Sequence, residues 1–200
     1  MGWPSPFGSR RLYLVRPAVT DAEVDGRVVG PDAVLHPRGR IAAMQLSQRI
    51  RDLGIDAIWS SPVPRAQQTA SLLAVDYPVP FGLDYALRDL EPGPWQGLTE
   101  EEIALRFPDA FATWSLSPSR LELEGRETLH QLQARVLGTL NRILSRHRSA
   151  LCVTHLAVIR VACLHALGES LDQFLRVDVG RSTIVELSWH HGAGRVRALD

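Results

Sequence analysis

The stretch Arg11-Leu-Tyr-Leu-Val-Arg-Pro-Ala-Val-Thr20 decides how the rest of the chain is interpreted. Residues 12–15 form an uninterrupted apolar run, as expected for a strand that is buried on both faces of a parallel sheet. Ligands of open α/β sheets bind beyond the carboxyl ends of the strands, so Arg16 is predicted to face a binding site. Pro17 follows it, fixing the backbone and removing an N–H donor.

Two further apolar runs, residues 56–60 and 150–155, are also predicted as strands, and both lead into helices. After the first, Ser61 is expected to be the N-cap and Pro62 the first helical residue. Arg65 would then lie in the first helical turn, where free N–H groups and the helix dipole favour an anion. His155 ends the second run as Arg16 ends the first. Parallel strands align their carboxyl ends, so Arg16, Arg65 and His155 are expected to lie together.

The remaining elements alternate in a way that indicates a three-layer α/β/α domain with a mostly parallel sheet. Apolar residues at helical spacing predict a helix over residues 37–52, with Ile41 and Met44 on its apolar face and Gly54 at its end. Further helices are predicted from Thr99, where a capping box begins, from Glu127, and over residues 156–167. Short strands are expected within residues 77–84 and in a hairpin over residues 183–199.

The composition describes an ordinary globular protein of 200 residues with no net formal charge. All 22 basic residues are arginine, and we draw no chemistry from that choice. The zero net charge gives no reason to expect a nucleic-acid or membrane partner. Cys152 and Cys163 are interpreted as reduced, buried thiols in a cytoplasmic protein. Residues 1–10 are expected to form a loose leader, and residues 11–200 a single domain.

Four blocks of this sequence resemble the histidine phosphatase superfamily, which includes phosphoglycerate mutase and the cobalamin-pathway phosphatases. The first block, Leu-Val-Arg-Pro-Ala-Val-Thr, is similar to the family's Leu-x-Arg-His-Gly-x-Thr. The most specific block begins at Ser60 and resembles Ser-Ser-x-x-x-Arg-Ala-x-Gln-Thr-Ala almost without departure. The others begin at Leu87 and Val153. The resemblance implies a phosphoglycerate mutase-like fold in which Arg16, Arg65 and His155 bind phosphate and Asp89 stands for the proton-donating glutamate.

The resemblance fails where it matters most for catalysis, because Pro17 stands where the family has its nucleophilic histidine. Asp89 is one methylene shorter than the glutamate it replaces. Other departures lie at substrate-side or phosphate-side positions of the family pattern; they are Ala18, Glu23, Val29, Leu156 and Ala157. Proline has no lone pair to attack phosphorus, so turnover through a phosphohistidine at this position is excluded.

Three functions remain open, in this order. The first is a protein that binds a phosphorylated or carboxylated small molecule without turning it over. The second is an enzyme with other chemistry, in which His155 and Asp89 act as acid and base on an anionic metabolite held by the two arginines. The third is a phosphomonoester hydrolase that uses His155 or water as the nucleophile. A fold that binds no ligand also stays open. No cofactor and no metal are expected, and a homodimer stays open.

Overall fold

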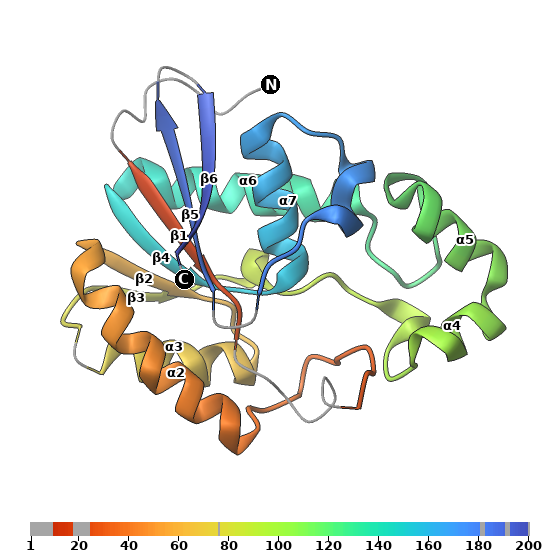
Figure 1. The fold of residues 1–200 in the computed structure, drawn as a ribbon, viewed down its shortest axis with the longest axis horizontal. Coiled ribbons are helices and arrows are strands. Elements are labelled where there is room, and N and C mark those ends of the chain that lie inside the picture. Colours follow the sequence, from red (N-terminus) through yellow and green to blue (C-terminus); the bar gives the residue numbers. More distant parts are fainter. Residues whose placement is uncertain (1–9, 18–24, 76, 181–182, 191–192, 200) are drawn as a thin grey trace.

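The computed structural model describes residues 10–17, 25–75, 77–180, 183–190 and 193–199. They form a six-stranded sheet with the order β3-β2-β4-β1-β5-β6, which runs through the middle of the molecule (Figure 1). The strands are β1 (Arg11–Val15), β2 (Ala57–Ser60), β3 (Phe81–Leu83), β4 (Ser149–Val153), β5 (Ile184–His190) and β6 (Ala193–Leu199).

The predicted strands at the centre of the sheet are confirmed. β1 pairs in parallel with β4, with Leu14 opposite Cys152 and Val15 opposite Val153. β2 lies on the other side of β4 and is also parallel to it. The hairpin of β5 and β6 adds two antiparallel strands beside β1, so the sheet is mixed and four of its strands are mutually parallel.

Helices cover both faces of the sheet and make the predicted three layers (Figure 1). α2 (Pro37–Ile50) and α3 (Pro64–Ala74) pack on one face, and α6 (Leu129–Arg146) and α7 (Leu156–Leu167) on the other. α4 (Glu100–Arg106) and α5 (Pro108–Leu116) lie beyond the end of the sheet. The short 3-10 helices are η2 (Arg51–Leu53), η3 (Tyr85–Leu87), η4 (Gly93–Trp95), η5 (Pro118–Arg120) and η6 (Leu171–Arg176).

The apolar run of β1 serves both layers because successive side chains of a strand point to opposite faces. Leu12 and Leu14 lie in the core under α6 and α7, and Tyr13 and Val15 in the core under α2 and α3. All four side chains are buried. This double burial explains why the run contains no polar residue.

The start of α3 differs from the prediction. Ser61 is not the N-cap and Pro62 is not helical, because Val63 is the N-cap and Pro64 takes the first helical position. Both Ser61-Pro62 and Val63-Pro64 satisfy the preference for proline at this position, and the chain uses the second. Arg65 therefore still lies in the first turn, as predicted.

The buried face of α2 also differs from the prediction. Its buried residues are Gly39, Ala43, Leu46 and Ile50. Ile41 and Met44, which were expected on this face, are exposed. α2 packs against its neighbour α3, and Leu46 and Ile50 enter the core that both helices share.

Other local predictions are confirmed. Thr99 and Glu102 form a capping box at α4, α7 spans residues 156–167, and Gly168 ends it with a φ of 72°. Both cysteines are free and buried. The predicted leader lies outside the described residues except for Arg10. No helix in the described ranges is long and apolar enough to cross a membrane.

Candidate functional site

Three elements deliver the predicted anion-binding residues to one small cavity. Arg16 follows β1, Arg65 lies in the first turn of α3, and His155 is the residue before α7. The cavity has a volume of about 40 Å³, which is little more than room for a few water molecules. Its walls are formed by Arg16, Pro17, Val29, Arg65, Asp89, His155 and Leu156. The structure thus brings together all four predicted site residues.

Arg65 and His155 form the buried floor of this cavity. Arg65 is 4% exposed and His155 is 2% exposed. Nη2 of Arg65 lies 3.2 Å from Nδ1 of His155, and Nη1 donates a hydrogen bond to the carbonyl oxygen of Gly30 at 2.8 Å. On the other side, Nη1 of Arg16 donates to the carbonyl oxygen of Val179 at 3.3 Å. The two guanidinium groups are thus oriented by main-chain oxygens.

The imidazole of His155 is held neutral. Its Nε2 lies 3.0 Å from Oγ of Ser61, which is fully buried. Burial lowers the pKa of His155 well below its usual value, and the charges of Arg65, Arg135 and Arg16 lower it further. Since a guanidinium only donates, Nδ1 must accept from Arg65, which assigns the imidazole proton to Nε2.

Asp89 lies at the edge of the cavity with its carboxylate 37% exposed. Its Oδ2 lies 3.6 Å from Nη2 of Arg65 and 3.6 Å from Nδ1 of His155. Partial burial raises the pKa of Asp89, while Arg65 and the N–H of Leu90 oppose this effect. The environment therefore favours a carboxyl group that can hold a proton at higher pH than an ordinary aspartate.

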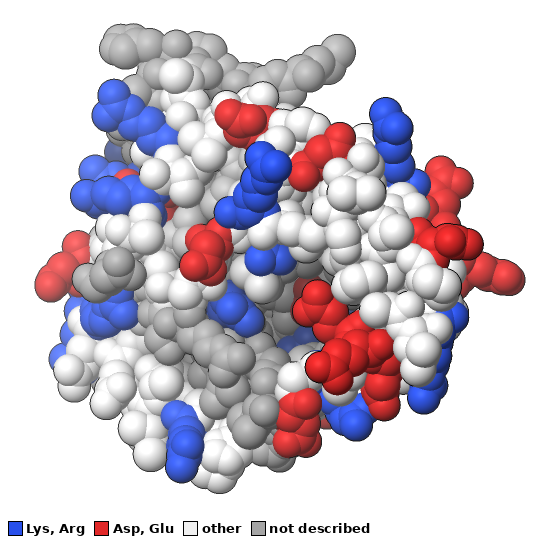
Figure 2. Space-filling model, turned by 45° about the vertical axis from the view of Figure 1, so that its right-hand side comes forward, with Lys and Arg blue, Asp and Glu red and all other residues white. Residues whose placement is uncertain are grey.

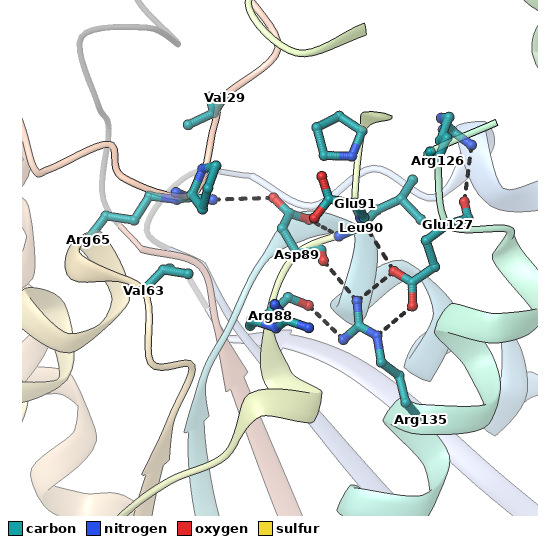
Figure 3. Close-up of a pocket in the computed structure, with 13 residues that line it drawn as sticks. Val29, Val63, Arg65, Arg88, Asp89, Leu90, Glu91, Arg126, Glu127 and Arg135 are labelled. Carbon is teal, nitrogen blue, oxygen red and sulfur yellow. Dashed lines mark hydrogen bonds and ion pairs between the residues drawn. The ribbon is translucent and has the colours of Figure 1, made fainter. Parts of the chain in front are cut away.

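The segment that carries Asp89 is held by Arg135, which projects from α6 (Figure 3). Nη1 of Arg135 donates to the carbonyl oxygens of Ala86 and Arg88, and Nη2 donates to that of Asp89. Glu127 orients this guanidinium through two hydrogen bonds of 2.6 and 2.7 Å. Arg135 therefore points from α6 into the protein and is not part of a solvated helix face.

Larger hollows adjoin the small cavity, and Figure 2 shows this face of the molecule with arginine side chains on the walls of a depression. One hollow, drawn in Figure 3, has a volume of about 380 Å³. A second has about 480 Å³ and includes Trp95, Phe111 and Trp114 on its walls. These aromatic residues pack against one another and also line this second hollow. Arg126, which lines both hollows, was missed by the sequence analysis.

The other residues that depart from the family pattern lie in different places. Val29 and Leu156 line the small cavity, and Ala157 lines the larger one. Ala18 and Glu23 lie outside the described residues. Among the residues that are described, no group of three or more His, Cys, Asp or Glu side chains is placed to bind a metal ion.

Comparison with known proteins assigns the chain to a family. The family model of the histidine phosphatase superfamily (branch 1) matches residues 12–200, so this protein belongs to that superfamily. It is 30% identical over 167 residues to phosphoserine phosphatase 1 of Hydrogenobacter thermophilus, which covers 82% of this chain and 79% of that protein. Other curated relatives are longer than this chain. The chain spans 34% of the length of one of them and 37% of the length of another.

Solved structures agree with this assignment. YhfR of Bacillus stearothermophilus superimposes with a TM-score of 0.86 at 28% identity, covering 94% of this chain and 95% of the other. A histidine-to-alanine mutant of phosphoserine phosphatase from Entamoeba histolytica, in complex with phosphoserine, gives a TM-score of 0.78 at 25% identity. It covers 93% of this chain and 94% of the other.

Proposed function

We propose that this protein binds a phosphorylated small molecule through its phosphate group and does not turn it over through a phosphohistidine. One observation carries the proposal: Arg16, Arg65 and His155 line the same cavity as Pro17. Two guanidinium groups offer the paired donors that suit phosphate oxygens. The first turn of α7 begins at Leu156 beside them and adds the positive end of a helix dipole.

The absence of turnover follows from the chemistry of the residue at the nucleophile position. In the family pattern this position falls on Pro17, whose ring nitrogen is an amide without a free lone pair. His155 is a poor replacement, because both of its ring nitrogens lie within hydrogen-bond distance of Arg65 or Ser61. Binding does not need a nucleophile. A related phosphoserine phosphatase in which one histidine is replaced by alanine forms a complex with phosphoserine, which supports binding by a family member that lacks a histidine.

Acid–base chemistry is the second candidate, favoured by the environment of Asp89 and His155. The raised pKa of Asp89 suits a proton donor, and the lowered pKa of His155 leaves a neutral base. Their atoms Oδ2 and Nδ1 lie 3.6 Å apart, beside the two arginines. Asp89 could then protonate the leaving oxygen while Nδ1 of His155, released from Arg65 by the bound phosphate, takes a proton from the attacking water. A cytoplasmic location and a homodimer stay predictions from the sequence.

Calorimetric titration with inorganic phosphate, phosphoserine and phenyl phosphate tests binding, and release of phosphate from the two esters tests turnover. We expect saturable binding, negligible release, and no acid-stable or base-stable phosphoprotein in quenched reactions with radiolabelled ester. The absence of binding for all three compounds would overturn the proposal. Efficient hydrolysis that is lost in Asp89→Asn would instead establish the second candidate.

A further inference from the structure

Arg126 is a buried cation whose position is fixed by two tryptophan rings. It belongs to the loop before α6 and is 8% exposed. The central carbon of its guanidinium lies 4.7 Å from the ring centroid of Trp95 and 4.3 Å from that of Trp114. These rings meet edge to face. Contact with both rings restricts the guanidinium, so little freedom is lost when it binds a ligand.

Within the described part of the chain, the guanidinium of Arg126 makes a single hydrogen bond, and that bond is long. Nη1 makes a long hydrogen bond of 3.4 Å to the carbonyl oxygen of Glu127, and Nε is buried without a partner. The carboxylate of Glu127 is already bound to Arg135. Burial lowers the pKa of Arg126 to about 10, which still leaves it charged at neutral pH. A buried charge with one long hydrogen bond and an unpartnered Nε is unfavourable, so an anion from outside the chain would stabilise it.

Arg126 faces the space that a bound ligand would occupy. It lines both large hollows, and both also contain Asp89. The larger hollow shares Arg16, Asp89 and Leu156 with the small anion cavity. A molecule whose phosphate is held by Arg16 and Arg65 can therefore extend toward Arg126 while remaining in the same depression. The walls on this path are largely aromatic or aliphatic.

We infer that Arg126 binds a carboxylate group of the same phosphorylated ligand, so that the ligand class is a phosphomonoester with a carboxylate on an apolar or aromatic body. This inference rests on the proposed function, because the phosphate must be anchored at Arg16 and Arg65. A planar carboxylate matches the planar guanidinium fork between two rings. Its single charge also balances one arginine, whereas a second phosphate would bring about two negative charges.

The test compares ligands that differ only in the carboxylate. Calorimetry on the full chain measures phosphoserine against phosphoethanolamine, and carboxyphenyl phosphate against phenyl phosphate. We expect the carboxylated member of at least one pair to bind roughly ten- to hundredfold more tightly. In Arg126→Met this ratio should fall toward one, while the affinity for the member without the carboxylate is unchanged. Arg120→Met, at an exposed arginine outside these cavities, should keep the ratio.

The possible results separate this inference from the proposed function. If phosphoethanolamine and phenyl phosphate bind and neither carboxylate adds affinity to the wild-type protein, the inference is wrong and the phosphate site stands. Tighter binding of hydroquinone bisphosphate than of carboxyphenyl phosphate would mean that Arg126 binds a second phosphate group instead of a carboxylate. If no ester binds, both proposals fail. If Arg126→Met does not fold, the affinity ratios of the wild-type protein still decide the outcome. Arg126→Lys, which keeps the positive charge but lacks the planar pair of donors, then takes the place of Arg126→Met.

Discussion

Nη2 of Arg65 lies 3.2 Å from Nδ1 of His155, in a pocket where both side chains are almost completely buried. The contact joins a residue from the start of α3 to the residue that precedes α7. It orients the guanidinium across the cavity floor and consumes the lone pair of the imidazole. A phosphate that accepts hydrogen bonds from Arg65 would compete with this contact. Anion binding is therefore coupled to the hydrogen bonding of His155.

Loss of either arginine should weaken anion binding. A charge-assisted hydrogen bond contributes roughly 1.5–3 kcal/mol, so Arg16→Ala and Arg65→Ala should each raise the dissociation constant for a phosphate ester about ten- to hundredfold. Calorimetry measures the change. Arg146→Ala, at an exposed arginine in the last turn of α6, is the matched control and should bind as the wild type does. Unchanged affinity in both site variants would place the anion elsewhere.

Glu127 should stabilise the protein through Arg135. Removing its carboxylate in Glu127→Ala leaves a largely buried guanidinium without its two closest acceptors, which we expect to lower the free energy of unfolding by about 1–3 kcal/mol. Urea denaturation measures this difference. Glu122→Ala changes an exposed glutamate of the same loop and should stay within about 0.5 kcal/mol of the wild type. Equal losses of unfolding free energy in the two variants would mean that the ion pair of Glu127 and Arg135 does not stabilise the fold.

His155 should make stability depend on pH. The folded state keeps its imidazole neutral, whereas in the unfolded chain it gains a proton below about pH 6.5. The unfolded state then binds more protons, so stability falls as the pH is lowered through about 6.5, by up to about 1.4 kcal/mol per pH unit. Above that pH the effect is absent.

The variant His155→Asn should lack this part of the pH dependence, measured as the free energy of unfolding between pH 5 and 8. His130→Asn is the control, because His130 is exposed and its replacement should leave the slope intact. If wild-type and His155→Asn proteins lose stability in parallel on acidification, His155 is not the buried neutral group inferred here.

The central strands and most helix ends could be predicted because local chemistry determines them. The apolar runs of β1 and β4 are long enough to indicate double burial, and Gly168 stops α7 because it adopts a positive φ. Parallel pairing then brings Arg16 and His155 to one edge of the sheet. The meeting of Arg16, Arg65 and His155 in one cavity was therefore predictable from three short stretches and one topological rule.

The rest of the site could not be predicted, because it depends on contacts between distant segments. Arg135 follows the spacing of an exposed helix face, and only the approach of residues 86–89 gives it acceptors. Arg126 lies in a loop of charged residues and has no local sign of burial. Its rings, Trp95 and Trp114, come from two separate elements, η4 and α5. Hydrophobic periodicity gives no information on such pairings.

Restoring a histidine at Pro17 tests whether this scaffold still supports phosphate chemistry. Pro17→His alone should give little hydrolysis, because Leu156 narrows the cavity and a nucleophile must reach near-attack distance of roughly 3–3.5 Å from phosphorus. Pro17→His combined with Ala18→Gly and Leu156→Gly should give measurable release of phosphate from phenyl phosphate, with a phosphohistidine trapped on acid-free quenching. The same triple variant with Arg65→Ala added is the control and should be inactive. If the triple variant binds the ester and stays inert, the carboxyl group of Asp89 does not reach the leaving oxygen, and Asp89→Glu in that background should then restore turnover because its side chain is one methylene longer.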